Sequence, residues 1–187
     1  MARTPSNMLA LGTKLPEFEL PDTVSGKMIS SDSLAASVSV VMFICNHCPY
    51  VKHVNDQLVK LSNDYIPKGV KFIAISSNDV IGYPEDAPEK MKAVAKELGY
   101  PFPYLYDESQ DVAKAFDAAC TPDFYLFNKE GELVYRGQLD DSRPSLDLPV
   151  SGRDLRNAID HVLAGTAVAE FQRPSLGCNI KWKVPQE

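Results

Sequence analysis

The feature of this sequence that most restricts its fold is an apolar segment that ends in two closely spaced cysteines. Residues 38–45 (VSVVMFIC) contain a single polar residue, which is the pattern of a strand buried on both faces of a largely parallel sheet. Cys45 ends this segment, and Cys48 follows at Cys-x-x-Cys spacing. From Pro49 apolar residues recur at steps of three and four, so a helix is predicted from about Cys48 to 67–69. A strand, a cysteine pair and a helix therefore form the predicted centre of the fold.

The other predicted elements complete an α/β domain. Residues 70–76 form a second apolar strand about thirty residues after the first, the separation that a parallel crossover unit requires. Residues 18–29 predict an N-terminal hairpin, because alternating residues flank a turn with Pro, Asp and Gly. Apolar spacing and turn residues predict further helices over 88–98, 109–118 and 155–163, and strands over 102–106, 123–127 and 132–136, the last two joined as a hairpin.

Length and charge limit the functional classes. The 187 residues fit a single domain, with a core of about 18–165 and an irregular tail over 166–187. The 19 Lys and Arg against 25 Asp and Glu give a net charge of −6, which disfavours binding to a nucleic-acid backbone. No apolar run reaches the ~20 residues that cross a bilayer, and no secretory signal precedes Pro16. We therefore expect a cytoplasmic protein without membrane partners.

The cysteine pair carries the chemistry that the sequence predicts. A helix N-terminus stabilises a thiolate, and two thiols at this spacing can close a disulfide, so the pair is expected to exchange two electrons without any other cofactor. Cys45 precedes the helix and is the expected attacking sulfur, with Cys48 as the more buried resolving one. His47, as an imidazolium, would stabilise the thiolate and make the pair more oxidising. The expected partners are a disulfide-containing protein or low-molecular-weight thiol and an upstream dithiol reductant.

Two separated motifs resemble a known superfamily. The pair Cys45 and Cys48 after an apolar strand, with Thr121-Pro122 before strand 123–127, resembles the thioredoxin superfamily. The N-terminal hairpin and the helix inserted over 84–98 are similar to the branch that holds peroxiredoxins and TlpA-like thiol-disulfide oxidoreductases. Six short motifs resemble a peroxiredoxin-like group of the alkyl hydroperoxide reductase and thiol-specific antioxidant type: CNHCPY, ND at 78–79, YPED, CTPDF, DDSRP and GCNIKW.

This resemblance implies a thioredoxin-like fold, in which helices flank a central mixed sheet. It also implies a cis peptide before Pro122, which would place the backbone of Thr121 beside the cysteine pair, with Asn46, Thr121 and Pro122 lining the substrate groove. Thioredoxins usually have Trp before the first cysteine and Gly-Pro between the two. This chain has Ile44 and Asn46-His47 instead, so the redox potential and the partner surface of thioredoxins do not transfer to it.

A thiol peroxidase is the second functional hypothesis. Peroxiredoxins place the peroxidatic cysteine directly before a proline, three residues after Thr or Ser, and Cys48-Pro49 fits the first part of that pattern. Cys45 stands at the position of the Thr and would act as the resolving cysteine. Peroxiredoxins also use an arginine near the cis-proline region, but residues 118–123 contain none. Arg136 or Arg143 would have to be brought to the site by folding.

The remaining cysteines leave further alternatives open. Cys120, next to Thr121-Pro122, is a candidate accessory thiol or an ordinary buried residue. Cys178, in the tail, is a candidate exposed thiol or resolving partner, although an ordinary role without chemistry is the expectation. Zinc binding by the pair with Cys120, Cys178, His47 or His53 is an alternative of another class, although no second paired motif supports it. A redox-silent binding module would tolerate loss of Cys45. The acidic residues Asp86, Asp140 and Asp141 are expected at the solvated surface, with Asp86 as a possible helix N-cap.

Overall fold

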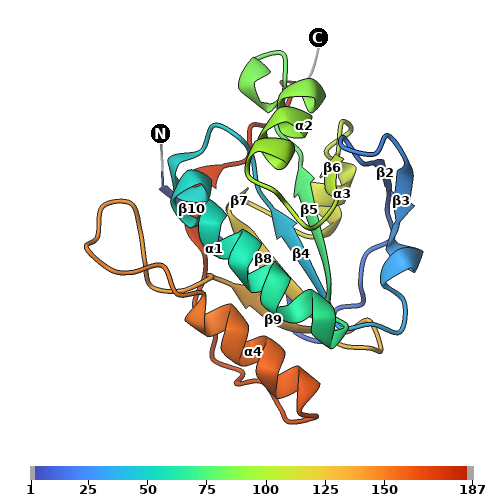
Figure 1. The fold of residues 1–187 in the computed structure, drawn as a ribbon, viewed down its shortest axis with the longest axis vertical. Coiled ribbons are helices and arrows are strands. Elements are labelled where there is room, and N and C mark those ends of the chain that lie inside the picture. Colours follow the sequence, from blue (N-terminus) through green and yellow to red (C-terminus); the bar gives the residue numbers. More distant parts are fainter. Residues whose placement is uncertain (1–2, 185–187) are drawn as a thin grey trace.

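A mixed five-stranded sheet forms the centre of the computed structural model, which describes residues 3–184 (Figure 1). The strand order is β6-β5-β4-β8-β9. β4, β5 and β6 are mutually parallel, whereas β8 and β9 run antiparallel to their neighbours. The strands are β4 (Ser39–Phe43), β5 (Lys71–Ser76), β6 (Tyr104–Tyr106), β8 (Asp123–Phe127) and β9 (Leu133–Gly137). This is the mixed sheet that the resemblance implied.

Helices cover both faces of this sheet. The buried side chains of α1 (Pro49–Tyr65), α2 (Pro88–Glu97) and α4 (Arg153–Leu163) belong to one apolar cluster, and those of α3 (Asp111–Ala115) belong to the other. β4 contributes alternate residues to the two clusters, as the period of a strand requires. Figure 1 shows α1 crossing β4 and β8, with α4 below it. Three short 3₁₀ helices link these elements: η1 (Ser31–Leu34), η2 (Ile66–Lys68) and η3 (Pro84–Asp86).

Most predicted elements are confirmed with small shifts of their ends. The N-terminal hairpin is β2 (Glu19–Pro21) and β3 (Met28–Ser30), paired antiparallel. The helix predicted after the cysteine pair is α1, and the parallel crossover to β5 follows it. Within the described residues, no helix combines the length and apolar character needed to span a membrane.

A second, three-stranded sheet joins the two ends of the chain. Its order is β1-β10-β7, and it consists of β1 (Arg3–Pro5), β10 (Leu176–Asn179) and β7 (Cys120–Thr121). β10 lies in the segment 166–187 that was expected to be irregular, because four residues containing Gly and Asn give no readable period. Residues 1–2 and 185–187, the ends of the predicted domain, lie outside the described residues. The second sheet places β10 beside the start of α1 (Figure 1).

Candidate active site

The cysteine pair occupies the junction between β4 and α1. One residue, Ile44, separates Cys45 from the end of β4. Cys48 is the N-cap of α1, with extended backbone angles (φ −69°, ψ 123°), and Pro49 occupies the first helical position. Both residues are buried, with exposed fractions of 2% for Cys45 and 0% for Cys48. The expected contrast between an exposed and a buried sulfur is therefore small.

Thr121 touches both cysteines through different atoms. The peptide between Thr121 and Pro122 is cis, as the resemblance implied. The hydroxyl oxygen of Thr121 lies 3.4 Å from the Cys45 sulfur, and its carbonyl oxygen lies 3.3 Å from the Cys48 sulfur. The fold thus brings together the two motifs of the resemblance, the cysteine pair and Thr121-Pro122.

The two other cysteines lie at different distances from the pair, and Cys120 takes the buried position that was one of its two expected roles. Cys178 on β10 lies with its sulfur 2.8 Å from the sulfur of Cys48. Cys120 instead directs its thiol to the carbonyl of Pro122 at 3.8 Å. The sequence favoured an ordinary role for Cys178 over that of a resolving partner, because its segment shows no period that would place it at the site, although it belongs to the GCNIKW motif of the resemblance. The third thiol at the site is therefore Cys178.

Hydrogen bonds and charge give the thiols of Cys45 and Cys48 different pKa values. The pKa of Cys48 is lowered to about 5, because its sulfur accepts hydrogen bonds from the thiols of Cys45 and Cys178 and from the backbone N–H groups of Val51 and Cys178. The pKa of Cys45 is raised well above its usual value by its hydrogen bond to Cys48, by burial and by the charge of Asp86. The first proton of the pair is therefore lost from Cys48, and the helix N-terminus stabilises the resulting thiolate.

Asp86 holds the backbone between the two cysteines through hydrogen bonds. Its buried carboxylate accepts hydrogen bonds from the backbone N–H groups of Asn46 at 2.8 Å and His47 at 3.2 Å, and from the amide of Asn78 at 2.7 Å. The predictions of a solvated surface position and of a helix N-cap were wrong. The N-cap of α2 is Ala87, whereas Asp86 ends η3 and points into the fold. Tertiary contacts therefore decide its position.

His47 is held between this carboxylate and an aromatic ring. Its Nδ1 lies 2.6 Å from an oxygen of Asp86, and its ring stacks on Tyr83 with centroids 5.3 Å apart. Potential ligand atoms of Cys45, His47 and Asp86 lie within 4.8 Å of one another, the one such group of three in residues 3–184. This group of three potential ligands differs from the zinc ligands proposed from the sequence, which included Cys48, Cys120 and Cys178. His53 is not part of the group and lines a depression next to Pro122.

Asn46 fixes the same loop to the sheet and to η3. Its side-chain amide donates to the carbonyl of Glu85 at 2.8 Å, and its oxygen accepts a hydrogen bond from the hydroxyl of Tyr104 at 3.1 Å. Both ends of this side chain are thus engaged within the protein. Asn46 restrains the backbone between the cysteines, in addition to the position at the groove that the resemblance implied.

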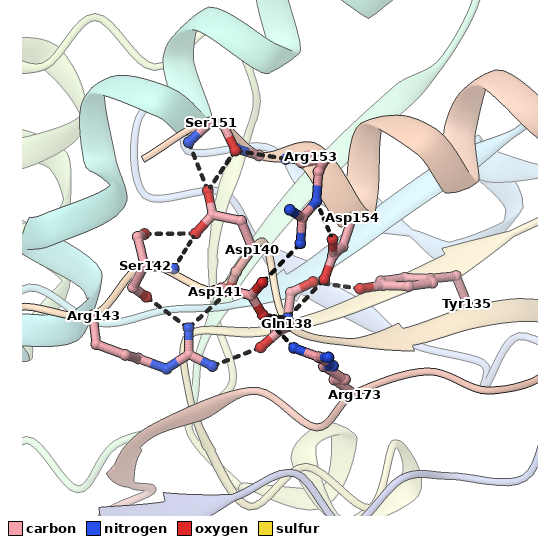
Figure 2. Close-up of polar contacts among 11 residues, drawn as sticks. Tyr135, Gln138, Asp140, Asp141, Ser142, Arg143, Ser151, Arg153, Asp154 and Arg173 are labelled. Carbon is pink, nitrogen blue, oxygen red and sulfur yellow. Dashed lines mark hydrogen bonds and ion pairs between the residues drawn. The ribbon is translucent and has the colours of Figure 1, made fainter. Parts of the chain in front are cut away.

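The two arginines proposed to assist a peroxidase are held by contacts of their own. The guanidinium of Arg136 donates to the carbonyl of Leu9 at 2.8 Å and to the side chain of Gln172 at 2.9 Å. Arg143 donates to the side chain of Gln138 at 2.7 Å and to backbone carbonyls of its own loop (Figure 2). Within the described part of the chain, neither guanidinium forms a hydrogen bond with a cysteine.

Asp140 anchors the long loop that contains Arg143. Its carboxylate accepts hydrogen bonds from the backbone N–H groups of Ser142 at 2.8 Å, Ser151 at 2.7 Å and Gly152 at 2.6 Å (Figure 2). Burial acts to raise the pKa of Asp140, but these hydrogen bonds prevail and lower it. The expected solvated position of Asp140 was wrong, since only 3% of the residue is exposed.

A buried carboxyl lies directly behind the cis peptide. Asp123 accepts hydrogen bonds from the hydroxyls of Ser6 at 2.7 Å and Tyr125 at 3.0 Å. Burial raises its pKa to about 7, because two neutral donors do not replace the hydration of a carboxylate. This acid therefore changes its charge in the neutral pH range, next to the strand that carries Thr121.

The fold and the three-thiol site together define a thiol redox protein of the thioredoxin superfamily. The chain belongs to the AhpC/TSA family, whose model matches residues 11–136, more than half of its 187 residues. The resemblance read from the sequence motifs is thereby confirmed at the level of the family.

Several solved structures are similar to this chain. An uncharacterized conserved protein from Geobacillus kaustophilus is 57% identical, with 100% of this chain and 99% of that chain covered and a TM-score of 0.97. A hypothetical protein from Sinorhizobium meliloti is 46% identical, with coverage of 97% and 100% and a TM-score of 0.95. A thiol:disulfide interchange protein from Chlorobium tepidum, 20% identical with coverage of 83% and 99% and a TM-score of 0.63, shares the fold. No curated protein matches this chain.

Proposed function

We propose that this protein is a thiol-disulfide oxidoreductase in which Cys45 and Cys48 alternate between dithiol and disulfide. One observation carries the proposal: the sulfurs of Cys45 and Cys48, at the junction of β4 and α1, lie 3.4 Å from the hydroxyl and 3.3 Å from the carbonyl oxygen of Thr121, next to the cis peptide. The lowered pKa of Cys48 and the raised pKa of Cys45 support it. A thiolate beside a protonated thiol is the arrangement that attacks a disulfide and then resolves it.

The charges favour an order of attack that is the reverse of the order expected from the sequence. The Cys48 thiolate attacks one sulfur of the substrate disulfide, the substrate S–S bond breaks, and the first substrate thiolate leaves. Cys45 then loses its proton and attacks Cys48, which forms the intramolecular disulfide and releases the second substrate thiolate. Two electrons pass from the pair to the substrate, and an upstream dithiol returns the pair to its reduced form.

Peroxide is the second candidate oxidant, and the burial of the pair favours it. With 2% and 0% of Cys45 and Cys48 exposed, a small oxidant reaches the sulfurs more easily than a protein disulfide does. The Cys48 thiolate would attack the O–O bond and form a sulfenic acid, releasing water or an alcohol. Condensation with the Cys45 thiol would then release water and form the same disulfide. The engagement of Arg136 and Arg143 elsewhere weighs against this candidate.

A stopped-flow comparison tests the proposal. The reduced protein is mixed with oxidised glutathione or with hydrogen peroxide, and the products are mapped by mass spectrometry. Cys48→Ser should lose the reaction, Cys45→Ser should keep the first attack, and Cys120→Ser is the matched control that should behave as the parent. Full activity of Cys48→Ser would reject Cys48 as the attacking thiol, and full activity of a Cys45→Ser/Cys48→Ser variant would reject a redox role for the pair. Fast oxidation by peroxide with slow exchange against glutathione would assign the peroxidase function instead.

We also propose the partners and the location that suit this chemistry. The substrate is a disulfide-containing protein or a low-molecular-weight disulfide, the electron donor is a dithiol, and a cytoplasmic setting would keep the four cysteines reduced between cycles. A Cys45→Ser/Cys178→Ser variant, which lacks both thiols near Cys48, should retain its partner in cells as a mixed disulfide on Cys48. Recovery of the same partners with Cys48→Ser would contradict the assignment.

A further inference from the structure

The C-terminal strand is built to bring a third thiol against the acidic one. Cys178 lies opposite Thr121 in the antiparallel register of β10 and β7. A Cβ atom at the preceding residue, Gly177, would lie 2.0 Å from the carbonyl oxygen of Thr121. Only a residue without a side chain lets β10 approach this closely. The close approach places the sulfurs of Cys178 and Cys48 2.8 Å apart.

We propose that Cys178 is a second resolving cysteine, which forms a disulfide with Cys48 in competition with Cys45. This inference rests on the proposed redox function of Cys48 and holds for either oxidant. A disulfide bond is ~2.05 Å long, so the two sulfurs need to approach by less than one ångström beyond their present 2.8 Å. Cys48 thus has a resolving thiol on each side, one from the helix junction and one from the C-terminal strand.

The exchange balances within the protein. Starting from the Cys45–Cys48 disulfide, the thiolate of Cys178 attacks the sulfur of Cys48, and the bond between Cys48 and Cys45 breaks with its electron pair on Cys45. Cys45 takes up the equivalent of the proton that Cys178 lost. The number of disulfides stays at one, so no external oxidant or reductant is consumed. From a mixed disulfide on Cys48, the same attack releases the substrate thiolate.

In the reduced site Cys178 is protonated, and oxidation of Cys48 removes two of the interactions that raise its pKa. Burial, together with the hydrogen bond and the charge of Cys48, raises the pKa of Cys178 to about 12. Once Cys48 is part of a disulfide, it carries no charge, and only burial opposes ionisation. Cys178 therefore becomes a better nucleophile at the moment when an electrophilic sulfur lies beside it. Lys181 favours the same thiolate through its positive charge.

The test uses the full chain and compares three variants: Cys45→Ser, Cys45→Ser/Cys178→Ser and Cys45→Ser/Cys120→Ser. Each reduced protein receives one equivalent of oxidised glutathione, and alkylation under denaturing conditions then precedes peptide mapping. Cys45→Ser should release both glutathione molecules and yield linked peptides containing Cys48 and Cys178. The variant without Cys178 should retain glutathione on Cys48 at least tenfold longer, and the variant without Cys120 should match Cys45→Ser.

Equal persistence of glutathione on Cys48 in all three variants would overturn the proposed role of Cys178 while leaving the redox function of Cys48 intact. Failure of glutathione to react with Cys48 in any of them would instead reject the proposed function. A Cys178→Ala version and circular dichroism check that the fold survives the change. The parent protein, which needs no substitution, should also yield Cys48–Cys178 linked peptides beside the Cys45–Cys48 form, and their absence would contradict the exchange.

Discussion

At the scale of single residues, the chemistry of the site depends on where one negative charge lies. Cys48 gathers several hydrogen-bond donors, while Cys45 lies next to a second anion, Asp86. The difference in pKa between the two sulfurs thus comes from the pair itself and from neighbours that are distant in the sequence, Asp86 and Cys178. Two substitutions test how Asp86 and its partner His47 set the charge at the site, and a third tests the buried carboxyl of Asp123.

Asp86→Asn should lower the pKa of Cys45, because it removes one of the charges that oppose a second thiolate. The ultraviolet absorbance of the thiolates, followed against pH, measures this change directly. Glu85→Gln is the matched control, since that side chain is exposed and its charge is screened by water. An unchanged titration of Cys45 in Asp86→Asn would show that the buried carboxylate does not act on the thiol.

His47→Ala should make the pair more reducing. Loss of the imidazole leaves Asp86 without a partner at 2.6 Å, and the less compensated anion disfavours the thiolates of the reduced form. Equilibration with glutathione redox buffers gives the reduction potential. A potential equal to that of the parent would remove His47 from the tuning of the site.

Asp123 should make the protein less stable as the pH rises toward neutrality. Its pKa is about 7 in the folded chain against 3.8 for the ordinary group, so the folded state binds the proton more tightly. The stabilisation is complete below pH ~4 and is lost as the pH passes through about 7, an effect on the order of a few kcal/mol. Urea unfolding from pH 4 to 8 should therefore show a flatter profile for Asp123→Asn. Parallel profiles for the two proteins would contradict the assignment.

At the scale of elements, the site depends on the approach of β10 to the cis peptide. Gly177→Ala should push these segments apart, because the added methyl group would meet the Thr121 carbonyl at 2.0 Å. Overpacking of this kind costs about 1–3 kcal/mol, which corresponds to a fall in Tm of roughly 2–10 °C for a chain of this size. Gly82→Ala is the control, since its Cβ would meet only the flexible Asp79 side chain. Calorimetry that gives equal Tm values for both variants would contradict the close packing of β10.

Elements with a strong local period could be predicted from the sequence, and those defined by distant partners could not. The spacing of apolar residues predicts β4, α1 and the hairpin of β8 and β9. β10 consists of four residues whose partners lie more than fifty residues away, so its pattern carries no period. Asp86 shows the same limit within the site. Its neighbours indicate a helix cap, whereas its partners Asn46 and His47 lie some forty residues earlier.

At the scale of the whole molecule, a bond between Cys48 and Cys178 would join positions 130 residues apart. Closing so long a loop stabilises a folded chain by about 5 kcal/mol in the chain-entropy view, or roughly 10 °C in Tm. Oxidised Cys45→Ser should therefore melt above its reduced form, as measured by calorimetry. Oxidised parent protein held as Cys45–Cys48 closes only a short loop and should gain far less. Equal Tm values for the reduced and oxidised forms of Cys45→Ser would contradict a disulfide between Cys48 and Cys178.

The pairing of β10 with β7 also has a consequence for the order in which a growing chain acquires its chemistry. Both cysteines of the pair are synthesised well before Cys178, whose thiol and backbone are two of the donors that lower the pKa of Cys48. A nascent chain that has not yet reached β10 therefore lacks these two donors. The full acidity of Cys48 appears only when β10 pairs with β7, so the reactivity of this thiol reports that the strand has docked.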